Sequence, residues 1–275
     1  MDTSDITCAT ITVEAGIAEV TLAATGKANR MGPEYWAQMP TLFSRLDAED
    51  AVRVVLLKGA GEHFSFGLDL ASMAAELAPI LQADAGAKAR QQLLATIRRL
   101  QEANTAVARC RKPVIAAVSG WCIGGGVDLI TACDVRLASS DAKFSVREVK
   151  LAMVADVGTL ARLPSIVGQG VARELALTGD DVDAARALKV GLVNDVFASQ
   201  AELLTAARAM AARMAKNSPL VLAGIKEVMN AQSETDARES LATVALWNAA
   251  FLPSKDLLEA MGAFMEKREP TFSGE

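Results

Sequence analysis

Residues 112–156 read KPVIAAVSGWCIGGGVDLITACDVRLASSDAKFSVREVKLAMVAD, and this segment decides the expected fold. It begins with an apolar run, Val114 to Val118, that is typical of a fully buried strand and that Gly120 ends. Three glycines follow at positions 124–126, and the apolar run from Val127 to Cys133 then predicts a helix. A glycine-rich turn between a strand and a helix presents backbone N–H groups that have no partner inside the helix.

Such a turn favours a ligand that carries negative charge, because the helix dipole places partial positive charge at the same point. If the ligand is a thioester that loses its α-proton, the charge of the enolate lies on the carbonyl oxygen, where fixed N–H donors stabilise it. The same segment supplies three carboxylates, Asp128, Glu148 and Asp156. Asp156 has the most apolar sequence neighbours of any acid in the chain, so we expect desolvation to raise its pKa toward neutrality.

Composition excludes several classes of protein. The 275 residues are 51% hydrophobic, which is enough for one large aliphatic core. A net charge of −5, without clusters of Lys and Arg among aromatic residues, argues against a nucleic-acid partner. No apolar stretch reaches membrane-spanning length, and the ends of the chain show neither a leader pattern nor a Ser-Lys-Leu address, so we expect a cytoplasmic protein that does not enter membranes.

The cysteines and the single histidine predict neither a metal site nor a disulfide framework. Cys8, Cys110, Cys122 and Cys133 form no Cys-x-x-Cys pair, so we interpret them as reduced thiols of the core. His63 alone is insufficient for a metal site or for a convincing Cys–His nucleophilic pair, and a structural role is the simpler interpretation.

The pattern along the chain predicts an α/β fold with a helical tail. Strands are expected at 8–13, 17–22, 52–58, 114–118 and 192–197, with a hairpin turn at 14–16. Helices are expected at 33–46, 71–109 with a break near 83–86, 127–133, 158–167, 171–177, 183–188 and through the last quarter. Pro40 should kink or shorten its helix, and Asp69 is placed to cap the helix that follows it.

The last amphipathic segment has Leu257, Leu258, Met261, Phe264 and Met265 on one side. This apolar face packs either on its own domain or on another subunit, and the sequence leaves both alternatives open. The glycine run itself is neither a dinucleotide fingerprint, which needs G-x-G-x-x-G spacing, nor a phosphate loop, because no Gly-Lys-Ser/Thr follows.

Four motifs together carry a family resemblance: KPVIAAV (112–118), GGGVD (124–128), CDVR (133–136) and FSFGLDL (64–70). With them the chain resembles the enoyl-CoA hydratase/isomerase (crotonase) superfamily over nearly its whole length. Within the superfamily it is most similar to the Δ3,5-Δ2,4-dienoyl-CoA isomerases, through IGGGVDL (123–129), VREV (146–149) and ADVGTL (155–160).

This resemblance implies a crotonase-like spiral of ββα units over residues 1–200 with the acyl-CoA site, and a helical C-terminal trimerisation region over residues 201–275. It implies a homotrimer or hexamer that binds a bent acyl-CoA and needs no cofactor beyond the CoA of the substrate. The amides of Phe66 and Gly125 would form an oxyanion hole. The remaining expected substrate contacts are Gly67, Leu68, Asp69 and Leu70, with Lys27, Ala28 and Asn29 as candidates for contact with CoA.

One residue departs from the family pattern. Phe66 stands where the family usually has alanine. A backbone donor survives this change, but a ring beside the thioester would narrow the acyl pocket.

The resemblance also implies roles for the acids. Conversion of a 3,5-diene to a 2,4-diene removes a proton at C2 and adds one at C6, and a carboxylate at each carbon performs both steps. Glu148 and Asp156 are this pair, with Asp128 orienting them, and we favour Asp156 as the base at C2 and Glu148 as the donor at C6. The alternatives are an enoyl-CoA hydratase, in which Asp128 and Glu148 hold a water, and a catalytically silent CoA-ester-binding scaffold.

Overall fold

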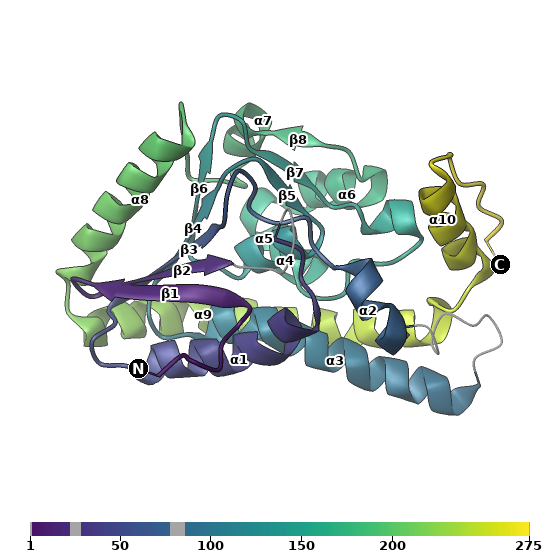
Figure 1. Cartoon of the computed structure of the whole chain (residues 1–275), viewed down its shortest axis with the longest axis horizontal. Helices are drawn as coiled ribbons and strands as arrows, with labels where there is room; N and C mark the ends of the chain where they lie inside the picture. Colours follow the sequence, from purple (N-terminus) through teal and green to yellow (C-terminus); the bar gives the residue numbers. More distant parts are fainter. Residues whose placement is uncertain (1, 23–28, 78–85, 275) are drawn as a thin grey trace.

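A computed structural model describes residues 2–22, 29–77 and 86–274 of the chain (Figure 1). Its largest sheet has the strand order β1-β2-β3-β4-β6-β9. β1 and β2 form an antiparallel hairpin, and every later neighbour in this sheet pairs in parallel. These strands are β1 (Ala9–Glu14), β2 (Ile17–Leu22), β3 (Val54–Gly59), β4 (Val114–Val118), β6 (Val135–Ser139) and β9 (Asp195–Phe197).

A second, smaller sheet explains the spiral. It has the order β5-β7-β8 and contains β5 (Trp121–Ile123), β7 (Lys143–Ser145) and β8 (Val182–Asp183). The chain passes from β4 to β5 and from β6 to β7, so each turn places one strand in each sheet before a helix follows. Ser65 pairs with Cys122 of β5 as an isolated bridge, which adds the 64–70 segment to the same edge. This arrangement confirms the predicted α/β spiral of ββα units.

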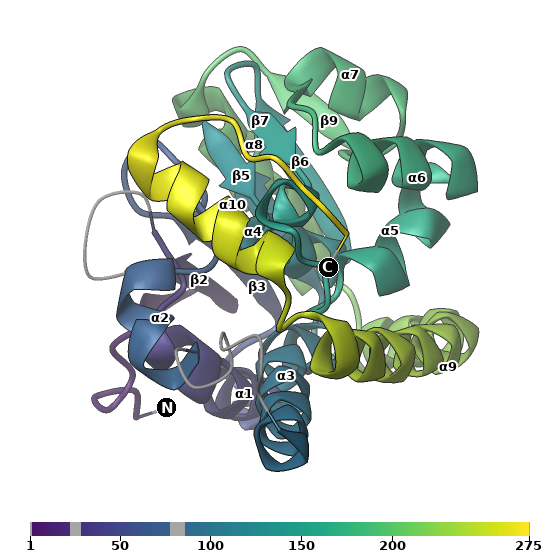
Figure 2. The same cartoon turned by 90° about the vertical axis from the view of Figure 1, so that its right-hand side faces the viewer.

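Helices surround the two sheets (Figures 1 and 2). They are α1 (Pro33–Ala48), α2 (Leu70–Leu77), α3 (Ala87–Arg109), α4 (Gly125–Thr131), α5 (Thr159–Val167), α6 (Gln169–Thr178), α7 (Ala184–Lys189), α8 (Gln200–Ala215), α9 (Pro219–Phe251) and α10 (Lys255–Glu266), with a 3₁₀ helix η1 at Glu148–Leu151. In the described part of the chain, no helix combines the length and apolarity that crossing a membrane requires.

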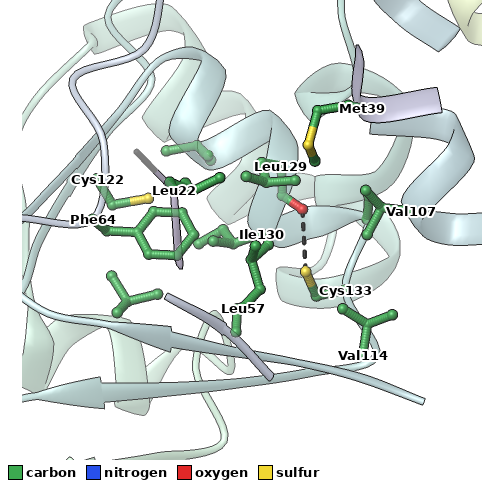
Figure 3. Packing of buried hydrophobic residues seen from close by; sticks show 14 of the residues in the cluster. Leu22, Met39, Leu57, Phe64, Val107, Val114, Cys122, Leu129, Ile130 and Cys133 are labelled. Carbon is green, nitrogen blue, oxygen red and sulfur yellow. Dashed lines mark hydrogen bonds between the residues drawn. The ribbon is translucent and has the colours of Figure 1, made fainter. Parts of the chain in front are cut away.

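Both faces of the large sheet are buried, which is why its strands are almost continuously apolar. On one face, Val54 and Leu56 of β3 pack with Leu203 and Ala207 of α8. On the other face, Val55 and Leu57 join the main core with α1, α3 and α4. Figure 3 shows part of this core, where Phe64 and Cys122 lie close to Leu129 and Ile130 of α4. The core therefore fixes α4 and the 64–70 turn against the same sheet edge.

Most of the predicted elements are present, with small shifts at their ends. α4 begins at Gly125, two residues before the predicted start, so the glycines themselves form its first turn. α1 continues through Pro40 to Ala48, so this proline does not shorten the helix. Trp36, Met39 and Phe43 are buried beside it, and their packing outweighs the one backbone hydrogen bond that proline removes.

Candidate active site

In the turn after β3, the hydroxyl of Ser65 fixes the backbone so that the N–H of Phe66 is available to a ligand. Ser65 Oγ donates to the carbonyl of Asn29 at 2.7 Å and accepts the N–H of Gly67 at 3.1 Å. Among the residues that the structure describes, the N–H of Phe66 has no acceptor. Gly67 has φ +72°, a left-handed conformation that glycine adopts without strain. This local geometry leaves one donor of the turn available to a ligand.

The second donor lies at the start of α4. The N–H of Gly124 is used by the Ser145 carbonyl at 3.0 Å, whereas the N–H of Gly125 has no acceptor within the described residues. A Cβ atom on Gly67 would lie only 2.9 Å from the nitrogen of Gly125. The two turns are thus in contact, and only glycine allows this approach. The arrangement suits an oxyanion of a carbonyl group.

A chamber next to these turns brings the three predicted acids together. It has a cavity volume of about 80 Å³. Its lining consists of a glycine of the α4 turn, the three acids, one amide side chain and six apolar residues: Gly125, Asp128, Glu148, Asp156, Asn248, Trp36, Leu68, Leu100, Met153, Val154 and Val157. Acids in such an apolar enclosure ionise with difficulty, so their pKa values rise toward the range of general acid–base catalysts.

Asp128 is completely buried on α4. Its Oδ1 accepts the N–H of Thr159, the first residue of α5, so it anchors the start of that helix. Its Oδ2 is buried and has no hydrogen-bond partner among the described residues. Burial raises the pKa of Asp128 to about 6, against the opposing effect of the bond from Thr159.

Glu148 lies beside the glycine turn, at the start of η1. Its Oε1 is 3.2 Å from the position that a Cβ atom would take on Gly124. Burial, followed by the charge of Asp128, raises the pKa of Glu148 to about 8. Its Oε2 is buried without a partner in the described part of the chain. Glu148 is therefore the acid placed at the carbonyl end of the chamber.

Asp156 lines both this chamber and a second cavity, so it lies where the two spaces meet. Its Oδ2 accepts a hydrogen bond from Asn248 Nδ2 at 2.7 Å. Burial raises the pKa of Asp156 to about 7, the bond from Asn248 lowers it, and the charge of Asp128 raises it. The prediction that the pKa of Asp156 is raised by its apolar surroundings is confirmed.

The second cavity is almost entirely aliphatic. It has a cavity volume of about 80 Å³, and Asp156 is its one acidic lining residue among those described. The others come from the 68–77 segment, α3, η1 and its end, and the C-terminal helices: Leu68, Leu70, Ala74, Leu77, Leu93, Thr96, Ile97, Leu100, Leu151, Met153, Leu252, Leu257 and Met261. Figure 2 shows α10 on the side of the molecule where α2 lies, as this lining requires. The cavity fits a hydrocarbon chain.

The ring of Phe66 lies away from both spaces. Its centroid is 5.1 Å from that of His63 and 6.3 Å from that of Trp121. Lys143 Nζ and Arg147 Cζ lie 5.1 and 5.3 Å from the centroid of Trp121. Neither the acid chamber nor the aliphatic cavity includes Phe66 in its lining. The Phe66 ring therefore lies with His63 and Trp121 and does not narrow the acid chamber or the aliphatic cavity.

The other predicted contacts differ in their surroundings. Lys27 and Ala28 lie outside the described residues. Asn29 is 4% exposed, and its Nδ2 donates to the carbonyls of Ala60 and His63, so its side chain holds the loop together. Asp69 precedes α2, and its Oδ1 lies 3.5 Å from the N–H of Ser72, a long capping contact.

The thiols and His63 remain structural. All four cysteines are free and buried, as predicted. Burial raises the pKa of the Cys8 and Cys110 thiols to about 11 and that of Cys133 to about 12, so they are poor nucleophiles. The Cys133 thiol contacts the Leu129 carbonyl at 3.4 Å (Figure 3). Within the described residues, no group of His, Cys, Asp and Glu has a geometry that would hold a metal ion.

Three contributors to the site were not predicted. Ser65 shapes the first turn, Trp36 lines the chamber, and Asn248 contacts Asp156. The sequence pattern around Trp36 indicated only that this residue packs in the core. Asn248 stands in the apolar run Ala245 to Phe251, and a polar residue in such a run signals a buried hydrogen bond.

Comparison with known proteins identifies the family of this chain. The profile of the enoyl-CoA hydratase/isomerase family matches residues 12–275. A mitochondrial Δ(3,5)-Δ(2,4)-dienoyl-CoA isomerase of Dictyostelium discoideum is 43% identical over 259 residues, which cover 93% of this chain and 87% of the relative. A peroxisomal Δ(3,5)-Δ(2,4)-dienoyl-CoA isomerase of Arabidopsis thaliana is 45% identical and covers 89% and 88% of the two chains.

A solved structure extends the likeness to three dimensions. The crystal structure of an enoyl-CoA hydratase/isomerase from Pseudoalteromonas atlantica T6c superimposes with a TM-score of 0.84 at 25% identity, over 97% of this chain and all of that one. The family profile, the sequence identities and the fold agree, and this chain belongs to the enoyl-CoA hydratase/isomerase family.

Proposed function

We propose that this protein is an acyl-CoA isomerase that converts a 3,5-dienoyl-CoA to a 2,4-dienoyl-CoA. The observation that carries the proposal is the spacing of two acids along one space. Glu148 lies at the glycine turn, and Asp156 lies where the chamber opens into the aliphatic cavity. The names of the Dictyostelium and Arabidopsis relatives state the same reaction for those proteins.

The thioester oxygen would accept the N–H groups of Phe66 and Gly125. Loss of the C2 proton creates a dienolate whose negative charge lies partly on this oxygen, and fixed donors stabilise it more than the neutral thioester. The α-carbon is bonded to the thioester carbon, so the base must lie near the glycine turn. Glu148 meets this requirement.

The placement therefore favours an order opposite to the one we favoured from the sequence. Glu148 takes the C2 proton, the electron pairs shift along the chain, and Asp156 gives its proton to C6. The C3–C4 and C5–C6 double bonds become C2–C3 and C4–C5 bonds, and no atom is gained or lost overall. Asp156 is the acid closer to the tail, since it lines the cavity that would hold the chain beyond C6.

Glu148 and Asp156 are in the reactive state when the two acids together carry one proton. Burial raises the pKa of Glu148 to about 8 and that of Asp156 to about 7, so the singly protonated pair is populated near neutral pH. Glu148 holds the proton in most of these molecules, and the assigned order proceeds through the smaller population in which Asp156 holds it. These side chains and the two amides supply the acid, the base and the charge stabilisation. We accordingly propose that no metal or cofactor takes part beyond the CoA of the substrate.

Two substrates test the proposal. Purified protein is mixed with a 3,5-dienoyl-CoA, and absorbance of the conjugated 2,4-diene is followed; a 2-enoyl-CoA is offered separately, and loss of the enoyl chromophore is followed. We expect fast conjugation and slow or no hydration. Rapid hydration without conjugation would refute the isomerase proposal.

Hydration is the second candidate, and one observation favours it. Asp128 Oδ2 and Glu148 Oε2 are both buried, line the same chamber and lack partners among the described residues. Two such acceptors are suited to hold a water between them. Asp128 Oδ1 already accepts the N–H of Thr159 at the start of α5. This bond holds the carboxylate in place, so Asp128 is less free to act on a water molecule.

A silent scaffold is the weakest alternative, because all three acids converge in one enclosed chamber. Binding of CoA esters without turnover of either substrate would support it. We also propose a cytoplasmic location for this chain, although the names of the two relatives place one in mitochondria and the other in peroxisomes.

We further propose that the protein assembles as a homotrimer or a dimer of trimers. α9 and α10 expose large apolar side chains, namely Leu220, Val221, Val228, Met229, Trp247, Phe251, Phe264 and Met265. An exposed apolar surface of this extent is typical of a face that another subunit covers. Light scattering after gel filtration tests the proposal, and a monomer at micromolar concentration would refute it.

A further inference from the structure

Asn248 is a buried polar residue whose side chain contacts one of the two acids of the proposed reaction. It is 2% exposed and lies between Ala245 and Ala249, which belong to an apolar cluster. Its Nδ2 donates to Asp156 Oδ2 at 2.7 Å and to the carbonyl of Val154 at 2.8 Å. A leucine of similar size would fill the position without burying an amide, so hydrogen bonding is what asparagine adds here.

The two bonds fix which way the amide points. The carbonyl of Val154 is only an acceptor, so it must face the nitrogen of the amide and not its oxygen. The second N–H of that nitrogen is then directed at Asp156 Oδ2. A hydroxyl could rotate between donor and acceptor roles, whereas this amide is a donor toward Asp156 in both protonation states of the acid.

The backbone of Asp156 is held from a second helix. Gln101 Nε2 of α3 donates to the carbonyl of Asp156 at 2.7 Å and to that of Leu241 at 2.9 Å. Asp156 is thus tied to α3 through its main chain and to α9 through Oδ2. Because Asn248 binds Oδ2, Oδ1 is the oxygen that can meet a substrate.

We propose that Asn248 is a positioning residue for Asp156: it holds Oδ2 so that Oδ1 meets the acyl chain, and it stabilises the carboxylate form of this acid. The proposal rests on the isomerase function proposed above. Asn248 acts through Asp156 and needs no contact of its own with the reacting carbons.

The surroundings of Asp156 make the hydrogen bond from Asn248 important for the pKa of this acid. Two titratable groups lie near it, Asp128 from α4 and Glu148 from η1, and the charge of Asp128 disfavours its ionised form. α3 contributes the neutral Gln101, and α10 contributes apolar residues to the adjoining cavity. Among the described residues, Asn248 is the one side chain that donates to this carboxylate. Its removal leaves a backbone hydrogen bond alone to oppose burial and the charge of Asp128, so the pKa of Asp156 rises.

The test is the pH profile of kcat/KM for the Asn248→Leu variant with a 3,5-dienoyl-CoA. Burial raises the pKa of Asp156 to about 7 and that of Glu148 to about 8, so the rising limb follows Asp156 and the falling limb follows Glu148. Loss of the donor raises the pKa of Asp156 and moves the rising limb upward by about one pH unit. We also expect kcat to fall about tenfold, because Asp156 is no longer held toward the acyl chain. The falling limb should move much less.

Two further variants complete the experiment. Asn230→Leu removes an asparagine of the same helix that donates to the carbonyl of Ala108 at 3.2 Å and lines neither the acid chamber nor the aliphatic cavity, so its profile should match the wild type. Asn248→Asp is nearly isosteric, and it should shift the limb at least as far, because it places another acid next to Asp156. It also serves as the test if thermal unfolding shows that Asn248→Leu does not fold.

The outcomes separate the two proposals. If the wild type does not isomerise the diene, the proposed function fails. If the wild type is active and both Asn248 variants keep its pH limbs, the positioning role is refuted while the function stands. An upward shift of the falling limb alone would show that the contact does not act on Asp156 and would refute the positioning role.

Discussion

The two ends of the proposed acyl site are formed by different parts of the protein: main-chain donors form one end, and side chains from several helices form the other. At the carbonyl end, donors come from the main chain of two glycine turns, and Glu148 follows them closely in the sequence. At the tail end, side chains from α2, α3, α9 and α10 meet around Asp156. The first end is rigid because a large buried sheet holds it, and its chemistry is independent of most side chains. The second end depends on helices that meet only in the folded chain.

The largest expected effect separates the acids at these two ends. Glu148→Gln and Asp156→Asn should each reduce isomerisation about 10³-fold, because each removes a general acid or base. Both variants should still bind CoA esters. Exchange of the C2 proton in D₂O distinguishes them: Asp156→Asn should keep the exchange, since Glu148 still forms the dienolate, and Glu148→Gln should lose it.

The opposite pattern of exchange would reverse the assigned order. If Asp156→Asn lost exchange at C2 while Glu148→Gln kept it, Asp156 would be the base near the thioester. A fully active Asp156→Asn variant would remove this acid from the reaction.

The same contrast explains what the sequence predicts and what it does not. The carbonyl end comes from two local segments, 64–70 and 112–148, and their strand-turn-helix pattern and glycines are sufficient to predict exposed amides. β5, β7 and β8 were missed because strands of two or three residues show no periodicity. They matter less for the chemistry than for holding the two turns together.

The tail end was predicted only in part. Asp156 stood out through its apolar neighbours, but its partner Asn248 lies 92 residues away and is brought in by the packing of α9. The order of the two acids also depends on distance from the glycine turn, which no sequence pattern reports. Pairings between helices far apart in the chain are the part that requires coordinates.

A second prediction tests the carbonyl end with the substitution Gly67→Ala, which replaces one hydrogen atom by a methyl group. Gly67→Ala places a Cβ atom 2.6 Å from the carbonyl oxygen of Ile123 and 2.9 Å from the nitrogen of Gly125, so the turns must separate. We expect about a 100-fold loss of kcat, as for the loss of an oxyanion donor. Steady-state kinetics of the folded variant measures it.

Gly61→Ala is the matched control. Gly61 has nearly the same φ, +73°, but nothing lies within 4 Å of its added Cβ atom. Both variants have the cost of a left-handed alanine, about 1–2 kcal/mol of unfolding free energy. Activity should fall only at position 67, and an equal loss in both would assign the effect to backbone strain.

A third prediction uses pH to probe both ends at once. Isomerisation requires one proton on the pair, so it should fall about tenfold per pH unit below the lower and above the upper apparent pKa. Burial raises the pKa of Asp156 to about 7 and that of Glu148 to about 8, so the maximum of kcat/KM should lie in this range. A maximum near pH 5 would show that the acids have ordinary carboxyl pKa values.

The smallest expected effect concerns the tail end alone. Met261 of α10 lines the aliphatic cavity, and Met261→Trp should fill part of it. Long acyl chains then lose space beyond C6, whereas a six-carbon dienoyl-CoA does not reach that far. We expect kcat/KM to fall about tenfold for a long-chain substrate and to stay within twofold for the short one, in line with the modest energies of apolar pockets.

Met265→Trp is the control, because Met265 lies on the same helix and is 81% exposed. Comparison of two chain lengths with each variant separates pocket filling from a general disturbance of α10. If Met261→Trp slowed both substrates equally, α10 would act on the acids through η1, on which it packs, and the aliphatic cavity would not be the site of the tail. If it slowed neither, the tail would leave the chamber by another path, and Asp156 would lose its assignment as the acid nearest C6.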